Sequence, residues 1–323
     1  MGTPDLGPVP LASAVAPGKV ILLGEHAVVY GRPAIAIPVD AVEARAVVWP
    51  SDRPLAVEAR FPDDEGQEPQ SYDVAGANEA LAAAVRAALA FAGRRDPPTW
   101  LVQVSSSVPT GRGMGSSAAV AVAAVRAVAR AASAHPDDAA VGAMAREAER
   151  VTHGTPSGID DTVIALGRPI RFSGGVGSPL APKAALTFLV ADSGARGPTR
   201  ALVEGVRDRR AERPDVYEAW FDRVGRLVDD AAAALAAGDT SRLGRLMDAN
   251  HLVLQAMRLS TPNLDRLVGA ARAAGARGAK LSGAGGGGVV VALVEAAGAD
   301  AVEAALVEAG AARVYRTTLA AAP

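Results

Sequence analysis

A glycine-rich loop, P-T-G-R-G-M-G-S-S-A-A at residues 109–119, joins a predicted strand at 100–106 to a predicted helix that runs from Ser116 to about Ala134. Its three glycines stand at alternate positions, so the backbone can turn tightly and approach a ligand closely. The helix directs the free amide groups of its first turn at the same place, which suits a phosphate. The spacing matches neither G-x-G-x-x-G nor G-x-x-x-x-G-K-[ST]. Taken alone, the loop also fits an ordinary turn with Ser116 or Ser117 as the helix N-cap.

The apolar patterns on both sides of this loop predict a mixture of strands and helices. Before the loop we expect strands at 13–23 and 34–48, an edge strand with a solvated loop within 51–76, and a helix at 78–92. After it we expect a helix at 137–150, short strands at 168–172 and 186–191, three or four helices between 200 and 274, and a strand, turn, strand, helix and strand from 279 to 317. The fold class is therefore α+β, with two lobes at 1–180 and 181–323.

Composition excludes several classes of protein. The length of 323 residues fits about two globular domains. Half of the residues are hydrophobic, which excludes a disordered chain. The chain has no cysteine, so disulfides, thiolate zinc sites, iron–sulfur clusters and a cysteine nucleophile are excluded. Lys and Arg number 33 against 35 Asp and Glu, so no bulk charge draws the chain to nucleic acid or to an anionic membrane. With no secretory signal and no bilayer-length apolar run, a cytoplasmic protein is expected.

Further polar segments interrupt the apolar scaffold. They are K-L-S-G-A-G-G-G-G at 280–288, A-P-G-K-V-I-L-L-G-E-H-A-V-V-Y-G at 16–31, E-R-V-T-H-G-T-P-S-G-I-D-D at 149–161, and Asp192-Ser193-Gly194 with Thr199. The first three have an ordinary structural explanation: a flexible turn at 280–288, a strand-edge charge at Lys19 and a loop histidine at His26 in 16–31, and a helix cap at Asp160 in 149–161. Together they supply a phosphate cradle, oxygen ligands for magnesium, a cation and a carboxylate, which phosphoryl transfer from a nucleotide requires.

These segments resemble the GHMP small-molecule kinase superfamily, in the order in which its motifs occur and over nearly the whole chain. The stretch S-T-P-N-L-D at 260–265 also fits. The resemblance is strongest to the members that act on mevalonate, because Ala-Val-Val-Tyr-Gly follows His26 and because His-Gly-Thr-Pro-Ser-Gly precedes Ile159. Phosphomevalonate kinases commonly carry Tyr in place of His26. The resemblance implies ATP-dependent phosphorylation of the primary hydroxyl of mevalonate, to give 5-phosphomevalonate for isoprenoid synthesis.

The resemblance also implies a fold and a site. The fold would combine an N-terminal lobe like ribosomal protein S5 domain 2 with a ferredoxin-like C-terminal lobe. Asp160 would be the catalytic base or orient the hydroxyl, with Lys19 beside it, and Mg²⁺ would be held by Ser117 and Glu149. The ATP phosphates would lie against Pro109, Gly111, Gly113, Met114, Gly115, Ser116, Ser117 and Ala118. The substrate would lie against Lys19, Glu25, His26, Asp160, Thr199 and Gly285.

The chain departs from the family pattern at one informative place. Asp161 follows Asp160 where the family often has Asn, and this extra carboxylate either points inward or faces solvent. We expect it to face solvent. A homodimer without nucleic-acid or membrane partners is the expected assembly. The alternatives are another kinase of the superfamily, acting on phosphomevalonate, a sugar or the 3-hydroxyl of mevalonate, or a nucleotide-binding sensor without catalysis.

Overall fold

The computed structural model describes residues 9–60, 70–73, 80–153 and 157–322, which fall into two compact units. The first unit comprises Met1–Gly18, Val42–Thr110 and Gly115–Gly167, and the second comprises Lys19–Ala41, Gly111–Met114 and Arg168–Pro323. The units therefore interleave along the chain, because β1 (Ala12–Leu23) and β2 (Ala34–Pro50) each contribute residues to both. The division into lobes at residue 180 stays a prediction.

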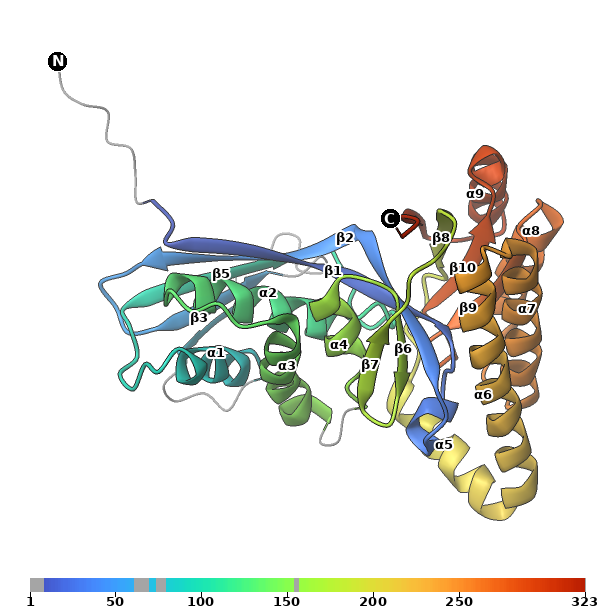
Figure 1. The fold of residues 1–323 in the computed structure, drawn as a ribbon, viewed down its shortest axis with the longest axis horizontal. Helices are drawn as coiled ribbons and strands as arrows, with labels where there is room; N and C mark the ends of the chain where they lie inside the picture. The colour runs from blue at the N-terminus through green and yellow to red at the C-terminus, as the bar shows by residue number, and fades with distance from the viewer. Residues whose placement is uncertain (1–8, 61–69, 74–79, 154–156, 323) are drawn as a thin grey trace. The chain divides into compact units, whose positions relative to one another are not determined.

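Strands of the first unit pair in a mixed pattern (Figure 1). The C-terminal half of β2 runs antiparallel to β5 (Trp100–Ser106), with Ala46 opposite Val104. β3 (Ala56–Arg60) runs parallel to β5 and antiparallel to β4 (Gln70–Asp73). The edge strand expected within 51–76 is β4, which ends the sheet, and β3 lies between β4 and β5.

Helices α1 (Ala80–Phe91), α2 (Ser116–Ala131), α3 (Asp138–His153) and α4 (Ile159–Leu166) complete the first unit. α2 contacts each of the other three, and it also packs on β5. Nearly every residue of α2 from Ala118 to Ala129 is buried, because a helix that is apolar all round must be covered on all sides. Its alanines and valines are small enough to let three helices approach.

The second unit is built on an antiparallel sheet of order β11-β8-β10-β9. Along the chain, β8 (Leu186–Asp192) is followed by helices, β9 (Gly278–Ser282), β10 (Val289–Val294), a helix and β11 (Arg313–Leu319). This is the ferredoxin-like arrangement, with the helical connections placed between the first and second and between the third and fourth strands. A smaller antiparallel group joins residues 34–36 of β2 to β6 (Ile170–Ser173) and β7 (Val176–Pro179). β7 has no counterpart among the predicted elements.

The helices of the second unit are α5 (Thr199–Glu212), α6 (Pro214–Ala237), α7 (Thr240–Ala256), α8 (Pro262–Ala273) and α9 (Ala299–Glu308), with 3₁₀ turns η1 (Ala27–Tyr30) and η3 (Ala296–Gly298). α6 and α7 lie side by side, and α7 packs on β9 (Figure 1). At that contact the backbones of Gly244 and Gly278 meet, and a Cβ on Gly244 would lie 2.1 Å from the oxygen of Arg277. Glycine in both elements is therefore what allows helix and strand to touch.

Candidate active site

Three glycine-bearing loops of the second unit pack against one another: residues 111–114, 193–197 and 283–288. Ser193 donates its backbone N–H to Gly288 O at 2.9 Å, and Gly288 donates its own to Ala195 O at 2.8 Å. A Cβ on Gly287 would lie 2.7 Å from Ala195 O, and one on Gly288 would lie 2.9 Å from Arg112 O. The glycines at these positions are needed because neighbouring loops of the same chain fill the space a side chain would take.

A small cavity among these loops collects four residues expected from the sequence. Gly111 and Gly113, from the loop that precedes α2, line it together with Thr199 and Gly285. Gly113 has a φ of +76° and Gly111 one of +69°, a backbone conformation that favours glycine. The loops therefore present backbone rather than side chains to this cavity.

Lys19 and Met114 are joined through the backbone of the same unit. Lys19 donates its backbone N–H to Met114 O at 2.9 Å, and Lys19 is buried. Two residues further along β1, Ile21 accepts a hydrogen bond from the Ser282 hydroxyl at 2.9 Å, and its N–H donates to the same oxygen at 3.0 Å. The expected cation Lys19 thus lies on a strand that is hydrogen-bonded to two glycine-bearing segments, through Met114 and through Ser282.

Glu25 is held inside the core of the second unit. Lys280 Nζ contacts Glu25 Oε1, and Asn250 Nδ2 donates to Glu25 Oε2 at 3.0 Å. Lys280 is fully buried, and burial lowers the pKa of its ammonium while Glu25 opposes that shift. Both carboxylate oxygens of Glu25, expected at the substrate, are therefore engaged by the protein itself. Lys280, the first residue of the glycine-rich segment 280–288, is thereby the ionic partner of Glu25.

His26 connects two of the loops. Its backbone has a φ of +60°, and its Nε2 donates to Ala284 O at 2.9 Å. Burial lowers the pKa of the imidazole, so the ring is neutral at physiological pH and Nε2 carries the proton in this hydrogen bond. The Gly-Glu-His segment is thereby fixed to the last glycine-rich loop.

Arg112 was not among the expected site residues. Its guanidinium pairs with Asp192, with Nε 3.2 Å from Oδ2, and Asp192 also accepts the N–H of Gly194 at 2.8 Å. The two residues are distant in the sequence, so spacing gave no signal for the pair. Arg112 thus links the loop before α2 to the segment that leads to Thr199.

The start of α2, in the first unit, has no side-chain cap. Gly115 occupies the N-cap position with a φ of +76°, and no side chain bonds to the first turn. The hydroxyl of Ser116 instead donates to Val108 O at 3.2 Å. The alternative interpretation of Ser116 or Ser117 as an N-cap is therefore wrong. The amide groups of this turn keep the donor capacity that an anion requires.

Ser117, Glu149 and Asp160 stand on three helices, α2, α3 and α4, that contact one another. Arg126, in the second half of α2, pairs with Asp138 at the start of α3, so these two helices run in opposite directions. Arg126 also donates to Ala165 O in the last turn of α4. Ser117, Glu149 and Asp160 stand toward the other ends of these three helices, away from the contacts of Arg126. Part of the motif that joins α3 to α4, residues 154–156, lies outside the described residues.

The donor set of Ser117 and Glu149 suits magnesium. Glu149 is a largely buried carboxylate and Ser117 an exposed hydroxyl. The described residues contain no group of three or more His, Asp or Glu side chains that would form an all-protein metal site. Mg²⁺ characteristically binds one or two carboxylates and completes its shell with substrate phosphates and water. The residues present fit that mode.

Asp161 does not face solvent as we expected. Only 1% of its surface is exposed, and Arg146 Nε donates to its Oδ2 at 2.8 Å. Burial raises the pKa of the Asp161 carboxyl to about 6, against the opposing effect of Arg146. Asp160 is not the cap of α4 either, because Gly158 takes that position and Asp160 lies in the first turn. The Asp-Asp pair thus splits into one buried carboxylate and one half-buried one.

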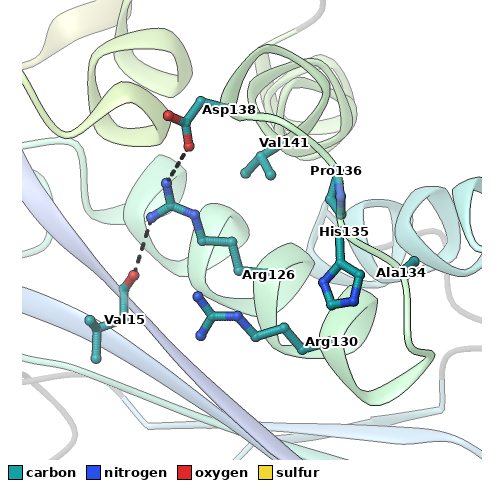
Figure 2. A pocket seen from close by; sticks show the side chains of 8 residues that line it. All are labelled: Val15, Arg126, Arg130, Ala134, His135, Pro136, Asp138 and Val141. Atoms are coloured by element: carbon teal, nitrogen blue, oxygen red, sulfur yellow. Dashed lines mark hydrogen bonds and ion pairs between the residues drawn. The ribbon is translucent and has the colours of Figure 1, made fainter.

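A cavity of about 490 Å³ lies at the other end of the bundle, where α2 ends and α3 begins. Figure 2 shows Arg126 in its wall, bonded to Asp138 and to the carbonyl of Val15. Its lining also includes Arg130 and His135. None of the residues expected from the sequence lines this cavity.

Comparisons with known proteins identify the family. The model of the GHMP kinases N terminal domain matches residues 79–168, and that of the GHMP kinases C terminal region matches residues 231–312. The chain belongs to the GHMP kinase family. The expected α+β class with the two-part GHMP kinase fold is thereby confirmed.

Two relatives of this GHMP kinase are both named mevalonate kinase. The chain is 37% identical over 301 residues to the mevalonate kinase of Thermococcus gammatolerans and 39% identical over 298 residues to that of Pyrococcus horikoshii. Each match covers 87% of this chain and 88% of the relative. The crystal structure of L. major mevalonate kinase in complex with R-mevalonate matches with a TM-score of 0.82 and 29% identity, covering 98% of both chains. Across the described residues, no helix combines the length and apolar character needed to cross a bilayer.

Proposed function

We propose that this kinase transfers the γ-phosphoryl group of ATP to the primary hydroxyl of mevalonate, giving 5-phosphomevalonate and ADP. The observation that carries the proposal is a helix start without a side-chain cap on α2, which packs against the helices that carry Glu149 and Asp160. A phosphoryl donor, its metal and an acceptor hydroxyl need these three features together. The shared name of relatives that match most of the chain supports mevalonate as the acceptor.

Each expected residue has a role in this proposal. Asp160 accepts the proton of the mevalonate hydroxyl as its oxygen attacks the γ-phosphorus, and Lys19 stabilises the negative charge on the transferring group. The backbone of 109–118 binds the ATP phosphates. Ser117 and Glu149 hold Mg²⁺, which neutralises phosphate charge when bound. Glu25, His26, Thr199 and Gly285 shape the substrate site, and Glu25 does so through the Lys280–Asn250 network that holds its carboxylate.

The first experiment is a coupled ADP-release assay with mevalonate, phosphomevalonate and galactose as acceptors. Turnover on mevalonate, with the product identified as the 5-phosphate by ³¹P NMR, is the expected result. Turnover on another acceptor and none on mevalonate would refute the proposal. Binding of ATP and mevalonate without any product would instead favour a nucleotide-binding sensor.

The second experiment tests Asp160. We expect Asp160→Asn to lower kcat by about 10²- to 10⁴-fold, the usual contribution of a positioned general base, with little change in the Kd of ATP. Asp138→Asn is the matched control, because Asp138 lies in the same bundle at the end where it pairs with Arg126. Wild-type activity of Asp160→Asn would remove Asp160 from its role. The cytoplasmic location and the homodimer stay predictions, and sedimentation of the purified chain tests the latter.

A further inference from the structure

We propose that Arg146 is a positioning residue, which fixes the first turn of α4 and thereby the carboxylate of Asp160. The inference rests on the role proposed above for Asp160. Arg146 lies on α3, one turn before Glu149, and its guanidinium reaches three groups at the start of α4.

The contacts of Arg146 surround the residue it would position. Its Nε donates to Asp161 Oδ2 at 2.8 Å, and its Nη2 donates to Thr162 Oγ1 at 3.2 Å and to Gly158 O at 3.4 Å. These partners precede and follow Asp160 in the chain. The Thr162 hydroxyl also donates to Gly158 O at 2.6 Å, which closes the network across the turn. The planar guanidinium of Arg146 bonds residues on both sides of Asp160 and thereby restricts the backbone of Asp160.

The backbone of Gly158 is adapted to this arginine. Gly158 has a φ of +85°, and a Cβ there would lie 2.7 Å from the Arg146 Cζ. The guanidinium therefore packs where a side chain would otherwise stand. Gly142, one turn before Arg146 on α3, lies close to Asp161 O, since a Cβ on Gly142 would be 3.6 Å from that oxygen. Helix α4 is thus seated directly on α3 at its first turn.

The charges at this turn explain why an arginine is needed there. Asp161 is buried beside the carboxylate of Asp160, so an ionised Asp161 without a partner would be costly in the core and would repel its neighbour. Arg146 balances that charge, and Asp160 and Arg146 are the charged groups that act on Asp161. Arg146 thereby allows a second carboxylate to stand beside Asp160 without moving it.

Arg126 offers a matched comparison in the same bundle. It pairs with Asp138 (Figure 2) and contacts the last turn of α4 through Ala165 O. Arg146 likewise pairs with Asp161 and contacts the first turn of α4. The two arginines are similarly exposed, with 22% and 26% of the side chain accessible. They differ in which end of α4 they hold, and Asp160 lies at only one of those ends.

The experiment compares Arg146→Met, Arg146→Lys and Arg126→Met in the full chain. We expect Arg146→Met to lower kcat by about 10- to 100-fold, because small displacements of a reacting group have effects of that order. The KM values of ATP and mevalonate should change by less than about 3-fold, since positioning acts on the transition state. Arg146→Lys should recover part of the loss, and Arg126→Met should keep the wild-type kcat.

A double variant separates positioning from stability. Arg146→Met leaves Asp161 buried without its cation, so its urea-unfolding midpoint should fall. Adding Asp161→Asn removes that unpaired charge and should restore the midpoint. The kcat should stay low, because Gly158 O and the Thr162 hydroxyl still lack the guanidinium. Hydrogen exchange of the amides at 158–163 should be faster in both variants than in the wild type, without any substrate present.

Three results overturn the inference. They are a wild-type kcat in Arg146→Met, an equal fall in kcat in Arg126→Met, and recovery of kcat together with the midpoint in the double variant. Failure of the proposed function is a separate outcome, because it appears as a wild-type chain that does not turn over mevalonate. In that case the hydrogen-exchange comparison still reports whether Arg146 fixes the first turn of α4.

Discussion

Replacing Asp161 by asparagine should change how the stability of the first unit depends on pH. The pKa of the Asp161 carboxyl rises from 3.8 to about 6 on folding, chiefly because the group is buried. Between these values the folded chain keeps a proton that the unfolded chain has released. The stabilisation of the folded chain by protonated Asp161 is therefore complete below about pH 4 and is lost as the pH rises through about 6. At about 1.4 kcal/mol for each pH unit, the loss totals about 3 kcal/mol.

An amide side chain at this position cannot ionise, so the variant avoids this loss. The free energy of unfolding of Asp161→Asn, relative to that of the wild type, should rise by about 1.4 kcal/mol between about pH 5 and about pH 8, since half of the titration lies below that interval. Most of the rise should be complete by about pH 7. The sign is decisive, because a carboxylate stabilised by its ion pair would give the opposite trend.

Urea unfolding followed by tryptophan emission measures this difference. A Trp220→Phe background leaves Trp49 and Trp100, which both belong to the first unit. Both proteins are compared in the same buffers at constant ionic strength. Parallel curves for the two proteins across this range would refute the buried position of the titrating carboxylate, and a falling difference would show that Arg146 outweighs burial.

Three further outcomes are expected. Lys280→Met leaves the Glu25 carboxylate in the core without its cation and should lower the free energy of unfolding by about 3 to 5 kcal/mol, so an unchanged urea midpoint would contradict the ion pair. Gly244→Ala places a Cβ 2.1 Å from Arg277 O and should destabilise the chain. Gly269→Ala is its control, because nothing lies within 4 Å of the added Cβ, and it should stabilise helix α8 by up to about 1 kcal/mol. Equal thermal midpoints for the two variants would refute the contact between Gly244 and Arg277. Chelation of divalent ions should abolish turnover, and added Mg²⁺ should restore it; full activity in excess chelator would exclude the assigned metal.

Local patterns in the sequence were sufficient for most of the secondary structure. The strand at 100–106 and the start of the helix at Ser116 are where the sequence predicts them, because glycine and turn residues mark both boundaries. β7 escaped prediction since Val-Gly-Ser-Pro at 176–179 lacks a strand-like pattern. The glycine-rich loops could be located from the sequence, but the loops that fill the space beside them could not.

The errors at the candidate site have a common physical cause. Asp161 resembles a surface residue when only its neighbours in sequence are considered, and its partner Arg146 lies 15 residues away on another helix. Glu25 and Lys280 are 255 residues apart and meet only in the folded core. Partners of buried charges are chosen by tertiary packing, and no period in the sequence encodes that choice.

The order in which the chain is synthesised has a consequence for its folding. Residues 19–41 belong to the second unit, and their partners lie far downstream: Ala34–Ala36 pair with β6, and Ile21 bonds to Ser282. Residues 19–41 leave the ribosome long before these partners exist, whereas the first unit is finished by Gly167. Although β1 pairs with β2, these residues must wait for their downstream partners during synthesis, and the apolar surface left exposed meanwhile favours aggregation. For the same reason, a fragment starting at residue 168 would lack strands of its own unit.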